Sequence, residues 1–329
     1  MHRASFLALG ASAALFPAAG RAAQSEFDPA MTAPQPSLRV LLGPGDAQAV
    51  PSGGFLFQGR PYRGTFSRTA GGAIVNVVGV EQYLYSVVPH EMPPTWPGAA
   101  LAAQAICART YVLQRSNPSR EYDLVPSEAD QVYSGVTTET PSGIAAVEGT
   151  AGQVLRYQGA FARVAYSSCC GGHTESAAEA WGGVPVAYLG GVVCPYCTQS
   201  PNYRWSATVA LDALAATFAS ELGPSGALQS VQILDRDASG RARSVALLAQ
   251  RGSATIKGAA FRASAGPRVV RSLLITGVRT AGPSLVLEGG GLGHGVGMCQ
   301  WGSRGMALAG RSARDILALY FPGTEIGND

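Results

Sequence analysis

A single glutamate, Glu91, lies in VVPHEMPPTWP (87–97), a stretch dense in proline and apolar residues. Apolar neighbours reduce the solvation of a carboxylate and raise its pKa, which favours a carboxyl group that donates a proton near neutral pH. The prolines restrict the local backbone and help to hold such a group in place. The stretch therefore predicts a general acid, and the alternative is an ordinary loop carboxylate that pairs with Arg109 or caps the following helix.

A second candidate site lies in two cysteine-containing segments, SSCCGGHTE (167–175) and GVVCPYCTQS (191–200). The second segment holds a Cys-x2-Cys pair and the first supplies Cys and His, which is the spacing of a tetrahedral zinc site. Four protein ligands leave no open position on the metal, so this zinc ion would be structural. The best ligand set is Cys170, His173, Cys194 and Cys197, with Cys169 as the alternative to Cys170.

Disulfides are the alternative to zinc in these segments. An exported chain meets an oxidising compartment, in which Cys170 could pair with Cys194 or Cys197. A redox site is a third interpretation, but the strand–helix setting of a thiol exchanger is missing. Cys107 and Cys299 have no evident partner in the sequence, and we interpret both as small apolar side chains.

The glycine-rich segment GGGLGHGVGMCQWG (289–302) contains His294 and Gln300. It does not match a nucleotide-binding loop, because the G-x-G-x-x-G pattern is broken and the lysine of a P-loop is missing. Its glycines allow the backbone to pass close to a ligand or another segment. His294 is therefore either a site residue or a buried histidine whose hydrogen bonds are satisfied.

Composition and charge narrow the class of protein. Of 329 residues, 47% are hydrophobic and 14% charged, which is typical of a globular chain. The net charge of +3, without a run of Lys or Arg, gives no reason to expect binding to nucleic acid. Residues 1–23 have a basic start, an apolar run and small residues at the end, as secretory signal peptides do. We therefore expect an exported mature chain, periplasmic or extracellular, without a membrane span.

Short strands and a few helices are expected to position these residues. Residues 24–37 read as a linker and 38–329 as one domain, with a strand-rich subdomain inserted around 205–265. Apolar residues on two faces of 98–114 predict an alanine-rich helix buried on most sides. A helix from residue 80 is expected to end at Pro89. Further predictions are strands at 38–42 and 73–80, a hairpin around Gln158-Gly159, a strand pair around 237–240, and helices at 212–223 and 312–323.

These elements define the expected fold class. It is α+β, with an antiparallel-strand-rich core, the buried alanine-rich helix, and a loop region held together by the cysteine and histidine residues.

Three segments resemble the SpoIID/LytB proteins, a family named for stage II sporulation protein D and an amidase enhancer. They are YLYSVVPHEMPPTWPGAALAAQAICARTY (83–111), SSCCGGHTE with WGG and YL (167–189), and GLGHGVGMCQWGSRGMA (291–307) with YFPGT (320–324). The resemblance covers about residues 70–325. It departs from the family at Cys299, where a serine often follows the G-H-G-V-G-M string.

The resemblance implies a protein directed at peptidoglycan, with Glu91 of the E-M-P motif as the catalytic acid of a lytic transglycosylase. In that reaction the C6 hydroxyl of the muramic acid attacks its own anomeric carbon and leaves a 1,6-anhydro end. Glu91 would first protonate the leaving oxygen and then accept the C6 proton. The chemistry requires no cofactor and no second carboxylate.

The resemblance also suggests roles for other residues. Arg109 of the A-R-T-Y motif would orient Glu91 or bind sugar, and Trp96 and Trp181 would stack on sugar rings. His294 and Gln300 complete the expected substrate-binding set. The expected partners are glycan strands, preferably stripped of stem peptides. The alternative functions are a non-catalytic enhancer of a cell-wall amidase and a structural zinc module without wall activity.

Overall fold

The computed structural model describes residues 36–329. The predicted signal peptide (1–23) and all but the last two residues of the predicted linker (24–37) lie outside the described residues. Within the described part, nearly all pairs of named strands are antiparallel, and helices are interspersed among the sheets. The predicted α+β class is therefore confirmed. No helix among residues 36–329 combines the length and the apolar character needed to cross a bilayer.

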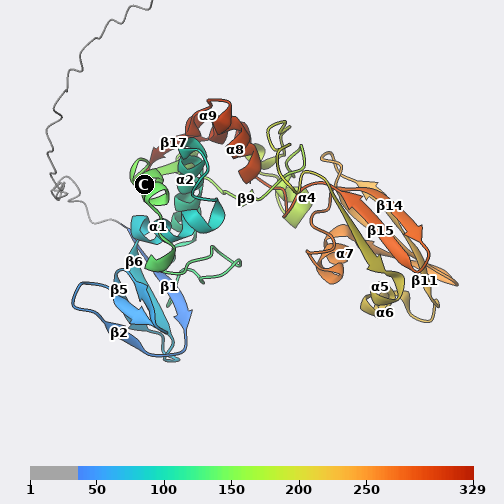
Figure 1. Cartoon of the computed structure of the whole chain (residues 1–329), viewed down its shortest axis with the longest axis horizontal. Helices are drawn as coiled ribbons and strands as arrows, with labels where there is room; N and C mark the ends of the chain where they lie inside the picture. The colour runs from blue at the N-terminus through green and yellow to red at the C-terminus, as the bar shows by residue number, and fades with distance from the viewer. Residues whose placement is uncertain (1–35) are drawn as a thin grey trace, which may run out of the picture. The chain divides into compact units, whose positions relative to one another are not determined.

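Two small antiparallel sheets begin the described chain (Figure 1). The first pairs β1 (Ser37–Gly43) with β6 (Ile74–Gly79) and β6 with β5 (Thr65–Arg68), so the strands predicted at 38–42 and 73–80 lie side by side. Leu38 and Val40 of β1 are fully buried, as alternation along a strand with one face on the core requires. The second sheet contains β2 (Ala47–Ala49), β3 (Phe55–Phe57) and β4 (Arg60–Tyr62).

Three helices pack together beside the first sheet: α1 (Val80–Glu91), α2 (Gly98–Arg115) and α3 (Pro141–Glu148). Helix α2 is buried from Ala103 to Thr110, which confirms the buried alanine-rich helix. The expectation that Pro89 ends α1 is wrong. A proline in the last turn removes one backbone hydrogen bond, and the amide of Met92 still donates to the Val88 carbonyl at 3.0 Å. Glu91 is consequently the last residue of a helix.

The predicted hairpin at Gln158-Gly159 joins β7 (Gln153–Tyr157) to β8 (Ala160–Phe161). Gln158 and Gly159 have φ values of 52° and 82°, which is the left-handed region that tight hairpin turns require. On its other edge, β7 pairs with the final strand β17 (Glu325–Asn328).

A two-residue parallel pairing brings the glycine-rich segment to the cysteine segment. Strand β16 (Met298–Cys299) pairs with β9 (Tyr166–Ser167), and helices α8 (Gln300–Leu308) and α9 (Ala313–Tyr320) follow. Ser312 and Asp315 form a capping box at the start of α9, within the helix predicted at 312–323. Short helical turns complete this part of the chain: η1 (Val136–Thr138), α4 (Ala177–Trp181) and η2 (Ala187–Leu189).

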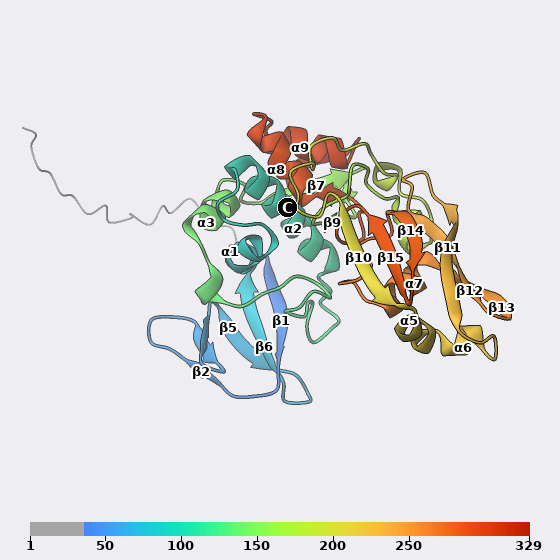
Figure 2. The same ribbon diagram turned by 45° about the vertical axis from the view of Figure 1, so that its right-hand side comes forward.

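Residues 205–289 form a second group of sheets with a hydrophobic cluster of their own, seen in yellow and orange in Figures 1 and 2. One sheet has the order β10 (Trp205–Ala210), β15 (Ser284–Gly289), β14 (Ile275–Ala281), and the other β11 (Leu228–Arg236), β12 (Ala242–Ala249), β13 (Gly252–Lys257). The predicted helix 212–223 is divided at Phe218 into α5 (Leu211–Thr217) and α6 (Ala219–Leu222). Helix α7 (Gly258–Ala265) packs against β12 and β13.

Candidate functional site

Glu91 lines a cavity of ≈ 590 Å³. Six segments of the chain line it: the end of α1, the end of α2, residues 128–132, the segment 163–168 that contains β9, the end of α4, and the glycine-rich segment with the first residue of α8. The structure thereby brings together four of the residues predicted from sequence, namely Glu91, Trp181, His294 and Gln300.

The carboxylate of Glu91 is half-buried and held by two side-chain donors. Gln300 donates from Nε2 to Glu91 Oε2 at 3.1 Å. The Tyr166 hydroxyl also hydrogen-bonds to this carboxylate and accepts from Gln131 Nε2 at 2.9 Å. Burial raises the pKa of Glu91, and the bonds from Gln300 and Tyr166 offset part of that rise. A larger fraction of Glu91 is therefore protonated near neutral pH than of a solvated glutamate.

Two further carboxylates line the cavity and differ from Glu91 in their surroundings. Asp130 accepts from the Tyr111 hydroxyl at 3.0 Å and pairs with Arg115 at 2.9 Å. Glu128 is exposed, and its charge contributes to the raised pKa of Glu91. Of the three carboxylates, Glu91 is the one held by Gln300 and Tyr166.

An aromatic pair forms one wall of the cavity. The rings of Trp181 and His294 lie 5.1 Å apart, and the guanidinium of Arg163 lies 5.3 Å from the Trp181 ring. Burial lowers the pKa of His294 to about 4, so its imidazole is neutral at pH 7. Its Nδ1 accepts from the Val296 amide at 3.0 Å, which assigns the ring proton to Nε2. The half-exposed Trp181 offers a flat apolar face of the kind on which sugar rings stack.

Arg109 and Trp96 lie elsewhere. Arg109 is fully buried and forms a two-point ion pair with Glu81, from Nε to Oε1 at 2.8 Å and from Nη2 to Oε2 at 2.5 Å. It therefore neither contacts Glu91 nor reaches the cavity. Trp96 packs against Trp301 at 5.1 Å between ring centroids and lines a different, smaller cavity. Arg109 lies on the inner face of α2, where α2 meets α1 and α3. This position on the helix separates its side chain from Glu91.

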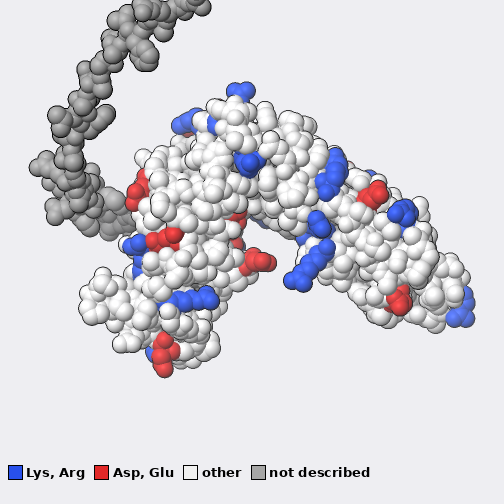
Figure 3. Space-filling view, in the orientation of Figure 1, with Lys and Arg blue, Asp and Glu red and all other residues white. Residues whose placement is uncertain are grey.

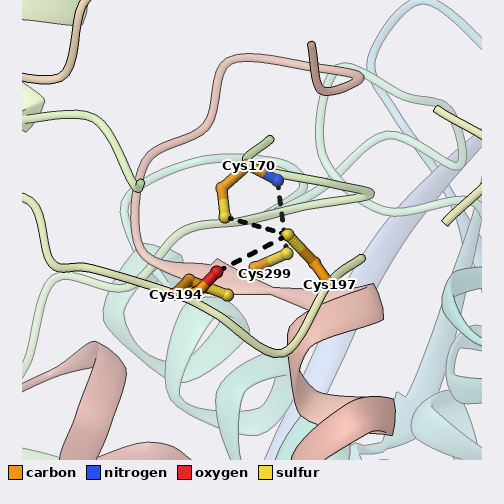
Figure 4. Close-up of side chains that lie close together, drawn as sticks. All are labelled: Cys170, Cys194, Cys197 and Cys299. Carbon is orange, nitrogen blue, oxygen red and sulfur yellow. Dashed lines mark hydrogen bonds between the residues drawn. The ribbon is translucent and has the colours of Figure 1, made fainter. Parts of the chain in front are cut away.

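Four cysteines from three segments converge in the interior (Figure 4). Their sulfur atoms lie within 4.8 Å of one another, and Cys170 Sγ lies 3.6 Å from Cys197 Sγ. The group is Cys170, Cys194, Cys197 and Cys299. His173 was expected in this set, but the structure places Cys299 in the fourth position. The His173 ring instead lies against the carbonyl of the next residue, with Nδ1 2.7 Å from Thr174 O.

The four sulfur atoms fit a zinc ion. Zn–S bonds of about 2.3 Å place the sulfurs of a tetrahedral site about 3.8 Å apart, close to the distance between Cys170 and Cys197. The amides of Cys170 and Gly302 lie 3.2 and 3.3 Å from Cys299 Sγ, and such donors favour a thiolate. Cys169, the alternative ligand, is buried but is not one of the four.

Sequence reasoning missed two residues of these sites. Cys299 was interpreted as an apolar side chain, although it departs from the serine common at that position in the resembled family. Tyr166 carried no signal, because it lies in an ordinary apolar strand pattern. The β9–β16 pairing, which joins residues far apart in sequence, places both.

Comparisons with known proteins show which sequences this chain resembles. The SpoIID family model, described as stage II sporulation protein, matches residues 69–157, and a model for a domain of unknown function matches 196–297. Stage II sporulation protein D of Bacillus subtilis is 30% identical over 79% of this chain and 77% of that protein. An uncharacterized protein of Brachyspira hyodysenteriae is 34% identical over 77% of this chain and 68% of its own length. The amidase enhancer of Bacillus subtilis is 30% identical over 74% of this chain, which spans 40% of that protein.

Proposed function

This chain belongs to the SpoIID family, and from that premise we propose that it is a peptidoglycan lytic transglycosylase with Glu91 as general acid and then general base. The observation that carries the proposal is the position of Glu91. It is half-buried, its pKa is raised by burial, and it lines a cavity beside an aromatic face. The expected substrate is a glycan strand, stripped of stem peptides, that stacks on Trp181.

In the proposed reaction, protonated Glu91 donates its proton to the glycosidic oxygen as the bond to the anomeric carbon breaks. The C6 hydroxyl of the same muramic acid then attacks that carbon, and ionised Glu91 accepts its proton. Gln300 and Tyr166 hold the carboxylate while its charge changes, since both donate to the ionised form. No water enters the product, so the masses of the two fragments sum to the mass of the strand.

Mass spectrometry of the products tests the proposal. The purified protein is incubated with glycan strands stripped of stem peptides, and the expected products end in 1,6-anhydro-muramic acid. Products that carry the mass of an added water would instead indicate hydrolysis. If the strands stay intact, the transglycosylase proposal is rejected.

A second candidate function is enhancement of a cell-wall amidase without cleavage of glycan. It is favoured by the relative named amidase enhancer. Under this alternative the cavity binds strands, and added protein accelerates release of stem peptides by an amidase while yielding no anhydro ends. The Glu91→Gln variant would then enhance the amidase as well as the parent does.

We further propose that the chain is exported and acts at the cell wall, because residues 1–23 have the pattern of a signal peptide and the family relatives carry sporulation and amidase-enhancer names. Glycan strands, and under the alternative an amidase, are the proposed partners.

We expect the pKa of Glu91 to rise when Tyr166 is replaced by Phe, because the variant loses a donor to the ionised carboxylate. Glu91 then stays protonated to higher pH, so the alkaline limb of the pH profile of kcat/KM should move to higher pH. Tyr157→Phe, a tyrosine outside the cavity, serves as the matched control. A downward shift in Tyr166→Phe would contradict the assigned hydrogen bond.

We propose that Cys170, Cys194, Cys197 and Cys299 hold a structural zinc ion that joins the cysteine segments to the start of α8. Elemental analysis should find about one zinc per chain in the parent and a large loss of zinc in Cys299→Ala. Cys107→Ala is the matched control, since Cys107 is equally buried in α2 but lies outside the four. Disulfide-linked peptides without metal would establish disulfides instead.

A further inference from the structure

A second cavity of ≈ 630 Å³ adjoins the one that contains Glu91. Trp181 and His294 line both cavities, so the two meet at this aromatic pair. The far wall of the second cavity comes from the group of sheets at residues 205–289, through the ends of β12 and β13 and the first turns of α7. A chain-like ligand that stacks on Trp181 beside Glu91 could therefore continue into this second cavity.

Four basic side chains line the second cavity, and two of them are neutralised by neighbouring carboxylates. Buried Arg241 lies 3.5 Å from Glu175, and Arg243 pairs with Glu179. Arg241 also donates to the carbonyls of His173 and Cys170, at 3.0 and 2.8 Å, which holds it against the cysteine segment. These two arginines are thus occupied in joining the sheets to the rest of the chain.

The other two basic side chains, Lys257 and Arg262, form no ion pair with any residue in 36–329. Lys257 is exposed at the start of α7. Arg262 is half-buried one turn further on, and its Nε and Nη2 donate to the Val270 and Arg271 carbonyls at 3.0 and 3.1 Å. Burial lowers the pKa of Arg262, as expected for a cation without a counter-charge. Figure 3 shows basic side chains gathered around α7.

We propose that Lys257 and Arg262 bind a carboxylate of the glycan strand, in a subsite of the second cavity that extends the Glu91 site. The inference rests on the proposed function, which supplies the glycan as ligand. A guanidinium held by backbone carbonyls is a pre-organised partner for a carboxylate, and a nearby ammonium adds a second charge. Two sources offer this chemistry: the lactyl group of a muramic acid without stem peptide, and the carboxylates of the stem peptide.

Binding measurements in the Glu91→Gln background test the subsite without cleavage of the ligand. Three probes are titrated by calorimetry: strands without stem peptides, the same strands with their lactyl carboxylates converted to amides, and strands with intact stem peptides. Lys257→Gln should weaken binding of the unmodified stripped strands about tenfold. It should leave binding of the amidated strands nearly unchanged. Arg279→Gln, an exposed arginine of β14 outside the cavity, is the matched control.

Arg262→Lys is the second variant, because it keeps the charge and removes the planar donor pair. It should weaken binding of the stripped strands by less than Lys257→Gln, again with no effect on amidated strands. If only peptide-bearing strands respond to both variants, the carboxylate belongs to the stem peptide and the subsite stands. Unchanged binding of every probe in both variants, or equal losses for charged and amidated strands, would overturn the subsite.

The cleavage assay separates this inference from the proposed function. A parent that yields no anhydro ends but binds in a carboxylate-dependent way would reject the transglycosylase and keep the subsite. If the parent cleaves stripped and amidated strands alike, and Lys257→Gln does not change binding in the Glu91→Gln background, only the subsite is rejected.

Discussion

Replacing Glu91 by Gln is expected to lower kcat for the release of anhydro-muramyl ends by about 10²–10⁴-fold, the usual contribution of a general acid–base group. Glutamine keeps the shape of the side chain and can still meet Gln300, but it cannot donate the proton that the leaving oxygen needs. Binding of stripped strands should therefore change little while turnover is lost. Parallel measurement of kcat and of strand affinity distinguishes these effects.

Glu128→Gln is the informative companion to Glu91→Gln, because Glu128 lines the same cavity and is exposed. Its charge helps to raise the pKa of Glu91, so the variant should keep the reaction and move the alkaline limb of the pH profile to lower pH. A Glu91→Gln protein that still releases anhydro ends at the parent rate would remove Glu91 from the mechanism. Loss of turnover in Glu128→Gln alone would transfer the role to Glu128.

Replacing Glu81 by Gln is expected to destabilise the protein by about 3–5 kcal/mol, because the buried guanidinium of Arg109 loses its counter-charge. Arg109 is fully buried, and its other partners are the carbonyls of Val147 and Gln153 and, more distantly, the Thr150 hydroxyl. These groups can share hydrogen bonds but cannot neutralise the charge. Urea unfolding followed by circular dichroism measures the change in the free energy of unfolding.

Glu139→Gln is the matched control for this ion pair. Glu139 forms an equally short two-point pair with Arg63, but the Arg63 side chain is 39% exposed, so a loss of about 1 kcal/mol or less is expected. Replacing both Glu81 and Arg109 by apolar residues should recover much of the stability lost in Glu81→Gln. Equal losses in the two single variants would show that burial does not set the cost.

The ion pair with Glu81 gives Arg109 a structural role, which differs from contact with substrate. Arg109 joins α2 to Glu81 of α1, and α1 ends at Glu91. Substitution of Arg109 should therefore reduce activity through stability, with the pH profile of the remaining folded enzyme unchanged. A catalytic role would alter that profile.

Local features of the chain were determined by the sequence itself. Four such features each depend on residues that lie close together in the sequence. They are the alternation in β1, the apolar pattern of α2, the positive φ values at Gln158-Gly159 and the capping box at Ser312. The apolar neighbours of Glu91 predicted a raised pKa, but the burial that raises it comes from several segments far apart in the chain. These local preferences agree with the global fold, as foldable sequences require.

Only the tertiary structure decided the partners of these residues. Gln300 reaches Glu91 across 209 positions of sequence, and Cys299 joins Cys170 across 129. The partner of Arg109 is Glu81, 28 residues away on a different helix, which spacing along the chain does not reveal. Contacts of this kind depend on how whole helices and sheets pack against one another. The short β9–β16 pairing sets two of these three contacts, those of Gln300 and Cys299. Because packing orients each side chain, it placed Cys299 among the thiols in place of His173 and turned Arg109 away from the cavity.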